Sequence, residues 1–528
     1  MERTFKPWPA LWALVFGFFM ILVDSTIVSI ANPAILEDLQ TDITAVLWVT
    51  SAYLLAYAVP LLITGRLGDR FGPKRIYLTG LVVFTLASLW CGFSGDIGML
   101  IAARAVQGFG AALMTPQTMA VITRIFPPNQ RGTAMGLWGA VAGIAMLVGP
   151  ILGGVLVDGL GWEWIFFVNV PVGIVAFFLA LRLVPNLETH QHRFDWLGVV
   201  LSGVGMFLVV FGIQEGETYD WGTITGPITV WGLIITGIVV LAGFVVWQAV
   251  NKAEPLLPLG LFRDRNFSLS NVAISLVGLA ITAMPLPLAF YYQIGRGLDP
   301  TQAALMLLPM AVVSGVMAPF IGKLTDRVNP KWVAFAGFTI VASALAWTSL
   351  WLTPDTDLWL LLLPNALLGV GITGVFAPLG SSATRNLPRS QAGAGSGVYN
   401  MTRQVGSVLG SAAITALLNA RLAAELPGYG GGAGFGGEGA HGGGELPPQV
   451  AEGFTAAMSQ SLWLSVIGFG VGALVVLFFA KPKVTVAWGG NGDSAESGAP
   501  GGSGAPGAPA AAPKSSNADA AAEAARAE

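Results

Sequence analysis

Two ionisable residues, Asp24 and Arg104, lie inside long apolar runs of the chain. The run around Asp24 begins near residue 10, so at 1.5 Å per helical residue the carboxylate lies roughly 20 Å along it. Arg104 is six residues into a run that enters from the opposite side, which places it roughly 9 Å below that surface. The two residues therefore share a depth in a hydrocarbon core of about 30 Å. Because an isolated charge there costs several kcal/mol, each needs a partner or a water-filled cavity.

The chemistry that these two residues offer is reversible protonation. A nearby cation favours the charged form of Asp24, and desolvation favours the neutral form. A carboxylate that alternates between such surroundings can take up a proton on one side of a membrane and release it on the other. The alternative is a permanent ion pair between Asp24 and Arg104 that only orients two helices.

A second group of charged residues lies in the segment GRLGDRFGPKR at 65–75, and a related segment, GKLTDRVNPK, lies at 322–331. The residues of interest are Gly65, Gly68, Asp69, Arg70, Gly72, Lys74 and Arg75, with Asp326 and Arg327 in the second copy. Glycines permit a tight turn and close helix approach, and the first aspartate can accept from a basic neighbour or cap the following helix. We interpret this short loop as a conformational latch. A positively charged loop with no further role is the alternative.

A glycine-rich helix is predicted at 133–157. Its candidate functional residues are Gly143, Gly149, Pro150, Gly153 and Gly154. Small residues let neighbouring helices touch, and a proline bends a helix. The pattern is typical of a hinge or seal, although packing alone also explains the glycines.

Polar and aromatic side chains within apolar runs are candidates for a central substrate cavity. They are Tyr53, Tyr57, Gln107, Gln117, Asn400, Arg403 and Gln404. Tyr53 and Tyr57 are one helical turn apart and therefore share a helix face.

Catalytic, metal and nucleotide motifs are missing from the sequence. The three histidines, at 190, 192 and 441, do not form a metal-ligand pattern, and no GxxxxGK[ST] segment for ATP occurs. We therefore expect no enzymatic activity, no cofactor, no metal and no nucleic-acid partner. Energy for any transport must come from an ion gradient.

The elements that position these residues are predicted to be membrane-spanning helices. The chain has 528 residues, of which 54% are hydrophobic and 10% charged, far fewer charges than the roughly 25% of a soluble domain. Apolar blocks long enough to cross a bilayer lie at 10–31, 46–65, 76–94, 98–122, 133–157, 163–184, 196–215, 226–250, 267–291, 303–322, 332–352, 358–381, 393–420 and 455–480. The predicted class is an all-α polytopic membrane protein with fourteen spans.

The basic residues predict the orientation of these spans. Most of the 26 lysines and arginines fall in segments on one side, and only Arg296 and Arg421 fall in loops on the other. Since basic residues stay on the cytoplasmic side during insertion, both termini are expected in the cytoplasm of a bacterium, with the protein in its inner (plasma) membrane.

The two copies of the GxLxDR segment are separated by eight predicted spans, which indicates an internal repeat. We predict a six-helix bundle at 1–195, an inserted hairpin at 196–250, and a second six-helix bundle at 251–484. The second bundle includes a Gly-rich outer loop at 425–449, and residues 485–528 have the composition of a disordered cytoplasmic tail.

Several of these segments resemble motifs of the major facilitator superfamily, in its fourteen-span drug:proton antiporter branch. GRLGDRFGPKR is similar to the signature loop, VDSTIVSIANP at 23–33 to the span-1 motif, LIAARAVQGFGAA at 100–112 to the span-4 motif, GIAMLVGPILGG at 143–154 to the span-5 antiport motif, and FRDRNFSLSN at 262–271 is also typical. The resemblance covers residues 10–480. It implies two six-helix bundles with an inserted hairpin, and it assigns proton transfer to Arg104.

The function that this resemblance implies is proton-driven export of drugs, antibiotics or related small amphiphilic metabolites by alternating access. A proton-coupled importer of a small nutrient and a non-transporting membrane sensor on the same scaffold are the alternatives. The expected partners are protons, a small-molecule substrate and the lipid bilayer, and the protein is expected to be monomeric.

Overall fold

The computed structural model describes residues 6–41, 43–127, 129–189, 195–216, 218–251, 255–298, 300–387, 391–426 and 448–480. The predicted tail at 485–528, the three histidines and most of the predicted Gly-rich loop lie outside these residues. At the edges of that loop the helices are longer than expected, because one continues through Glu425 and the next begins at Pro448.

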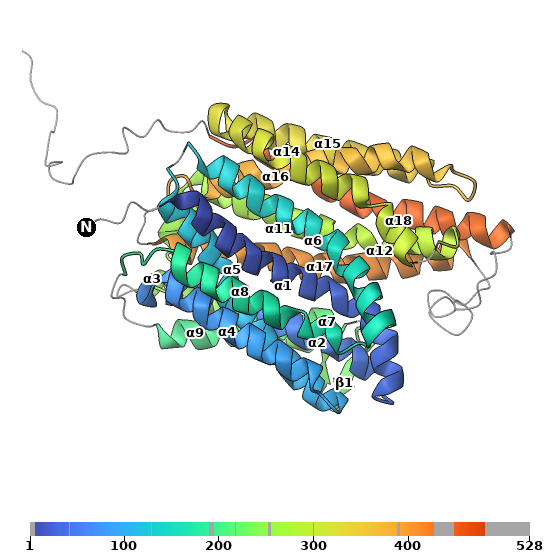
Figure 1. The fold of residues 1–528 in the computed structure, drawn as a ribbon, viewed down its shortest axis with the longest axis horizontal. Coiled ribbons are helices and arrows are strands. Elements are labelled where there is room, and N and C mark those ends of the chain that lie inside the picture. Colours follow the sequence, from blue (N-terminus) through green and yellow to red (C-terminus); the bar gives the residue numbers. More distant parts are fainter. Residues whose placement is uncertain are drawn as a thin grey trace, which may run out of the picture. The chain divides into compact units, whose positions relative to one another are not determined.

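The described residues form helices and one short two-stranded ribbon (Figure 1). The elements are α1 Pro7–Asp38, α2 Ile43–Ala58, α3 Leu61–Phe71, α4 Pro73–Gly92, α5 Ile97–Ile125, α6 Arg131–Leu160, α7 Trp164–Phe167, α8 Asn169–Leu183, α9 Trp196–Gln214, β1 Thr223–Thr225, β2 Ile228–Thr229, α10 Val230–Val250, η1 Leu259–Arg263, α11 Arg265–Ala283, α12 Pro285–Phe290, η2 Tyr291–Gly295, α13 Pro300–Leu305, α14 Leu308–Arg327, α15 Pro330–Trp351, η3 Leu358–Leu361, α16 Leu362–Thr384, α17 Ala392–Glu425 and α18 Pro448–Val476. Within the described residues, 13 helices are long and apolar enough to cross a membrane, and one bent pair raises the number to 14. The predicted polytopic all-α class is confirmed.

The second predicted span, 46–65, differs from expectation because it is broken. Its two parts, α2 and α3, meet at an angle of 46°. Pro60 lies in the break, and a proline lacks the backbone N–H that a continuous helix needs.

The segment at 65–75 is helical rather than a loop as far as Phe71. Gly72 alone separates α3 from α4, and its φ of 93° is a backbone conformation that side chains other than glycine rarely adopt. Asp69 therefore projects from α3. The expected cap of the following helix, α4, is not formed by this residue.

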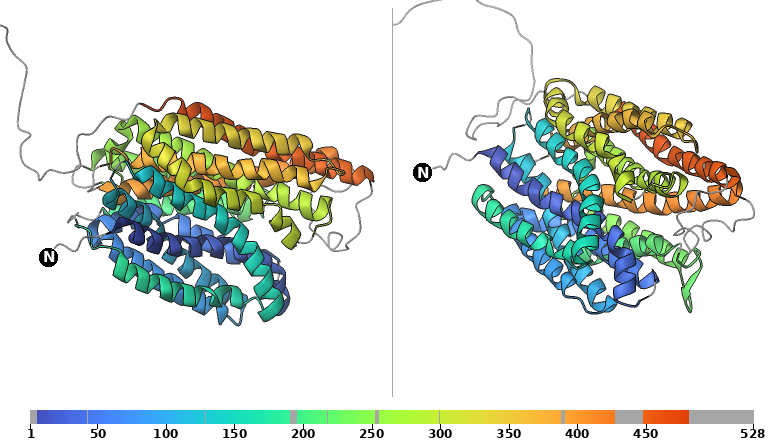
Figure 2. Two further views of the ribbon diagram at one scale, coloured as in Figure 1. Left: turned by 45° about the horizontal axis from the view of Figure 1, so that its top comes forward. Right: turned by 45° about the vertical axis from the view of Figure 1, so that its right-hand side comes forward.

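The helices of the described unit pack in two sets that touch along a few helix pairs. α1, α2, α4, α5, α6 and α8 contact one another, and α11, α14, α15, α16, α17 and α18 do likewise. Figure 2 shows the first set in blue to teal and the second in yellow-green to red. The sets meet where α6 packs on α14 and α16, and where α17 packs on α3 and α5. The exact division at 195 and 250 stays a prediction.

The predicted inserted hairpin consists of α9 and α10, which pack on each other and are joined through the ribbon of β1 and β2. α9 also contacts α2 and α17. Asp195 ties the other end of the hairpin together, because its carboxylate caps α9 at the Gly198 N–H and accepts from Trp247 and Gln248 of α10. Partial burial opposes the charge, but these hydrogen bonds together lower the pKa of Asp195.

Candidate functional site

Asp24 and Arg104 form a direct ion pair in which both side chains are 0% exposed. Arg104 Nη1 lies 2.6 Å from Asp24 Oδ2. The other carboxylate oxygen accepts from the amides of Gln107 and Asn169, each at 2.8 Å. The guanidinium also donates through Nε to the Val49 carbonyl. The pair is thus the centre of a buried polar cluster that joins α1, α2, α5 and α8.

Asn169 is a member of this cluster that sequence analysis missed. It begins α8, and it donates both to Asp24 and, at 3.1 Å, to Ser88 Oγ. A lone asparagine in the apolar run at 163–184 was the available signal. Gln107, by contrast, was expected in the substrate cavity, but its side chain bonds to Asp24 and Arg104.

Asp69 lies near the end of α3, away from the Asp24–Arg104 cluster. Its side chain forms hydrogen bonds from the first helix set to the second. Its two carboxylate oxygens accept from the Gly393 and Ala394 backbone N–H groups, each at 2.9 Å. Arg124 adds an ion pair at 2.5 Å. The carboxylate therefore caps the positive end of α17, in the other half of the chain.

Asp326 makes the reciprocal contact. It accepts from the backbone N–H groups of Gly132 and Thr133, at 2.7 and 3.0 Å, and from the Thr133 hydroxyl at 2.7 Å. These residues begin α6. Each GxLxDR aspartate thus caps a helix of the opposite set, and we call this end of the protein, predicted to face the cytoplasm, the inner end.

Close helix approach makes both caps possible. A side chain at Gly65 would collide with the backbone of Gly393, and one at Gly68 would collide with Gln117. Gln117, another expected cavity residue, instead donates to the Thr64 carbonyl at 2.7 Å. The remaining basic residues of the motif lie around the caps: the Lys74 ammonium donates to the Leu181 carbonyl, Arg70 lies over the Phe71 ring, and Arg75 and Arg327 are exposed.

The glycines of α6 have different surroundings. A Cβ at Gly149 would collide with Thr26 Oγ1 of α1, and one at Gly153 would lie 2.9 Å from Ile27 Cγ1. At Gly143 the nearest atom is Ser314 Oγ of α14, 3.4 Å away, and at Gly154 nothing lies within 4 Å. Pro150 lies inside the helix between the two tight positions. Of these four glycines, Gly149 and Gly153 are therefore the two that lie in close contact with α1, the helix that carries Asp24.

We expect Gly149→Ala to impair transport because the added methyl group must push α6 and α1 apart. Overpacking of this kind costs about 1–3 kcal/mol. Gly154→Ala is the matched control on the same helix, since its methyl group meets open space. The measurement is transport rate per folded protein. Equal rates for the two variants would contradict a role for this contact.

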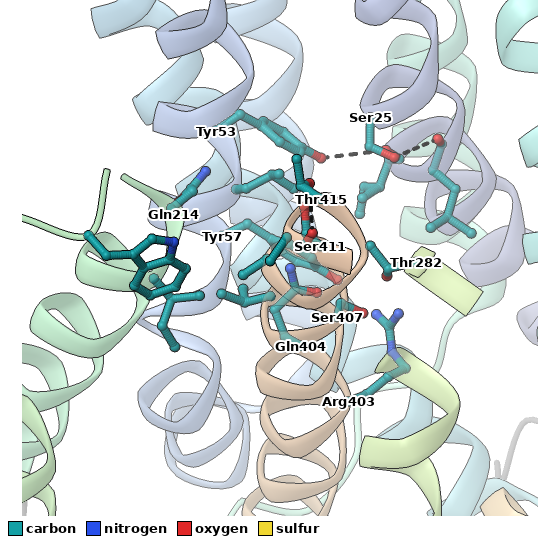
Figure 3. Close-up of a pocket in the computed structure, with 18 residues that line it drawn as sticks. Ser25, Tyr53, Tyr57, Gln214, Thr282, Arg403, Gln404, Ser407, Ser411 and Thr415 are labelled. Carbon is teal, nitrogen blue, oxygen red and sulfur yellow. Dashed lines mark hydrogen bonds between the residues drawn. The ribbon is translucent and has the colours of Figure 1, made fainter. Parts of the chain in front are cut away.

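A cavity of about 280 Å³ opens between the two helix sets and the hairpin. Figure 3 shows side chains of α1, α2, α9, α11 and α17 pointing into it. It is lined by Ile21, Leu22, Ser25, Tyr53, Leu54, Tyr57, Ile213, Gln214, Trp221, Thr282, Arg403, Gln404, Ser407, Val408, Ser411, Ala412, Thr415 and Ala416. Along α17, whose first residue is Ala392 at the inner end, these positions lie roughly 17–36 Å from that end. Because α17 has 34 residues and is therefore roughly 51 Å long, this range is centred on its middle. The cavity thus lies at mid-height in the protein, and Gln214 and Thr282, near the ends of α9 and α11, extend it toward the outer end.

The expected cavity residues divide into two groups. Tyr53, Tyr57, Arg403 and Gln404 line the cavity. Asn400 does not, since its amide donates back to the Ser396 carbonyl of the same helix. Tyr53 also reaches the buried ion pair, because the Arg104 guanidinium carbon lies 4.1 Å from the centre of its ring.

The family model described as "Major Facilitator Superfamily" matches residues 14–411. The chain belongs to the major facilitator superfamily. The resemblance drawn from the motifs is confirmed at this level, and a member of this superfamily is a transporter, not an enzyme.

Two bacterial proteins are among the relatives of this superfamily member. The chain is 54% identical over 90% of its length to a protein named "Uncharacterized MFS-type transporter Rv1250" of Mycobacterium tuberculosis, and it covers 81% of that protein. It is 34% identical over 80% of its length to the "Tetracenomycin C resistance and export protein" of Streptomyces glaucescens, of which it covers 78%.

A solved structure with the same fold is the major facilitator superfamily proton:xylose symporter XylE. The TM-score is 0.60 at 12% identity, and the match covers 90% of this chain and 95% of the other. The superfamily fold of this multi-pass membrane protein therefore rests on sequence and structure together.

Proposed function

We propose that this protein exports small amphiphilic molecules, of the kind of drugs or antibiotics, in exchange for protons. The observation that carries the proposal is the buried pair of Asp24 and Arg104, which lies next to the cavity and shares Tyr53 with it. An export protein among the relatives, named for tetracenomycin C, supports the direction of transport.

The geometry corresponds to one state of an alternating-access cycle. The inner end is closed by the caps of Asp69 and Asp326, and the cavity extends from mid-height toward the outer end. In this outward-facing state a proton arriving from outside neutralises Asp24. The guanidinium then loses its ionic partner, and its remaining neighbours are the Val49 carbonyl, Gln107 and the Tyr53 ring.

Tyr53 is the residue through which this change reaches the cavity. Its ring faces Arg104, and its hydroxyl donates to the Ile21 carbonyl of α1. When Arg104 moves, the Tyr53 ring moves with it and changes the shape of the cavity wall. Protonation of Asp24 and binding of the substrate in the cavity therefore oppose each other through Tyr53. The cycle then requires the caps at the inner end to open.

The proposal includes the predicted setting: the cytoplasmic membrane, with both termini in the cytoplasm. Everted membrane vesicles test direction and energy source together. With tetracenomycin C as the first probe, followed by a panel of labelled amphiphiles, an inside-acid gradient should drive uptake. Movement in the opposite direction would show a proton-coupled importer, and no gradient-dependent movement of any panel member would show a sensor.

Tyr53→Phe and Tyr53→Leu separate the ring from the hydroxyl. The ring's contact with a buried cation is worth about 2 kcal/mol, so we expect Tyr53→Leu to reduce proton-driven uptake at least about tenfold. Tyr53→Phe keeps the ring and should retain most of the activity. Uptake and substrate binding are measured for both variants. Unchanged uptake by Tyr53→Leu would refute the coupling role.

A further inference from the structure

The charge of the cavity wall is positive. Arg403 is the only ionic side chain among the described residues that line the cavity. Asp24, the nearest buried carboxylate on α1, is already paired with Arg104. Glu215 follows the lining residue Gln214 but is only 5% exposed, and burial raises its pKa, which disfavours its charged form.

Arg403 has an unused hydrogen-bond donor. Its Nε atom is buried, and no partner for it lies among the described residues. The ion pairs in the described part of the chain involve Arg104 and Arg124, not this arginine. A buried donor without a partner is costly. Other buried atoms of the described residues share this state, among them Arg104 Nη2 and Trp138 Nε1, but of these residues Arg403 is the one that lines the cavity, where a ligand can supply the acceptor.

The surroundings of Arg403 are rich in donors and in apolar surface. Figure 3 shows the side chains of Arg403 and Thr282 in the lining of the same cavity, with Gln404 and Ser407 on the same helix as Arg403 and with Tyr53 and Tyr57 on α2. Apolar walls come from α1, α2 and α9, and Trp221 adds an aromatic face from the hairpin connection. A ligand for this wall has an acceptor group at one end and a flat apolar body.

We propose that the substrates of this site are organic anions: amphiphiles whose carboxylate, sulfonate or phenolate binds Arg403 while the ring system packs against the aromatic and aliphatic wall. This assignment rests on the proposed export function and names its substrate class. The guanidinium fork matches a carboxylate with two parallel hydrogen bonds. A cationic drug meets the same fixed positive charge and is repelled.

The test compares two dyes that share a tricyclic skeleton and differ in charge. Carboxyfluorescein is anionic and rhodamine 123 is cationic. Binding to the purified full-length protein in nanodiscs is measured by fluorescence polarisation, with no proton gradient. We expect carboxyfluorescein to bind, Arg403→Gln to weaken it at least about tenfold, and Arg403→Lys to weaken it less. Arg296→Gln, an arginine bonded to the Thr356 carbonyl and not part of the lining, should change nothing.

A second variant keeps the proposal testable if Arg403→Gln does not fold. Ser407 is one helical turn from Arg403 and lines the cavity, so Ser407→Asp supplies an internal carboxylate to the arginine. It should abolish carboxyfluorescein binding, whereas the neutral Ser407→Asn should retain it. Rhodamine 123 binding more tightly than carboxyfluorescein, or equal anion affinity in Ser407→Asp and Ser407→Asn, would overturn the assignment.

Failure of this assignment can be told apart from failure of the export proposal. Anion binding that depends on Arg403 without gradient-driven uptake would leave the substrate class standing and refute export. Gradient-driven uptake of rhodamine 123 that is unaffected by Arg403→Gln would support export and refute the anion site.

Discussion

We expect proton-driven uptake into everted vesicles to fall to background when Asp24 is replaced by Asn. The variant cannot carry a proton on this side chain, and it leaves the Arg104 charge buried without an ionic partner, a change that costs about 3–5 kcal/mol. Glu37→Gln, an exposed acid on the same helix, is the control and should transport normally.

Two further measurements distinguish proton carriage from a structural ion pair. Substrate counterflow without a gradient should survive in Asp24→Asn, which shows that the variant is folded and that only coupling is lost. The double variant Asp24→Asn with Arg104→Gln has no buried charge in the pair. If the pair only orients α1 and α5, this double variant regains gradient-driven transport; if Asp24 carries the proton, it stays inactive.

The second large effect is expected at the inner end, for Asp69→Asn. An amide can accept one of the two hydrogen bonds from Gly393 and Ala394 but not both, and it loses the ion pair with Arg124. Hydrogen bonds to a charged group contribute about 1.5–3 kcal/mol each, so opening at this end should rise about tenfold to a hundredfold. We expect transport to fall while membrane insertion is unchanged.

Hydrogen exchange locates the effect of Asp69→Asn. The amides at the start of α17 should exchange faster in this variant, and those at the start of α6 should not. Asp326→Asn should give the reverse pattern, because its partners are Gly132 and Thr133. Each variant is thus the control for the other. Normal transport together with unchanged exchange in Asp69→Asn would refute the latch. The alternative, a positively charged segment with no further role, would then remain.

The number and order of the spans could be predicted from the sequence because bilayer thickness sets the length of each apolar block. The break at Pro60 could not, since a single proline barely changes the average hydropathy of its block. The depth argument for Asp24 and Arg104 anticipated that they share a level. Their direct contact also depends on how each helix is rotated about its axis, and the depth of a residue gives no information on that rotation.

Helix rotation also decides which polar residues face the cavity. Gln107 and Arg403 are both polar residues within spans, but one bonds to Asp24 and the other lines the cavity. The hydrogen-bond partners of Asp69 could not be predicted from the sequence for another reason. They are backbone N–H groups more than three hundred residues away in the chain, and every residue type except proline offers such a group, so no residue type marks them.

The inserted hairpin forms part of the cavity wall, through Ile213, Gln214 and Trp221, while the buried ion pair is built on α1, α2, α5 and α8. In the proposed cycle, substrate recognition and use of the proton gradient therefore rest largely on different parts of the polypeptide. We expect mutations in the hairpin to change which compounds are carried without altering proton coupling. Under the proposed function, the hairpin is thus a separate region in which the range of transported compounds can diverge.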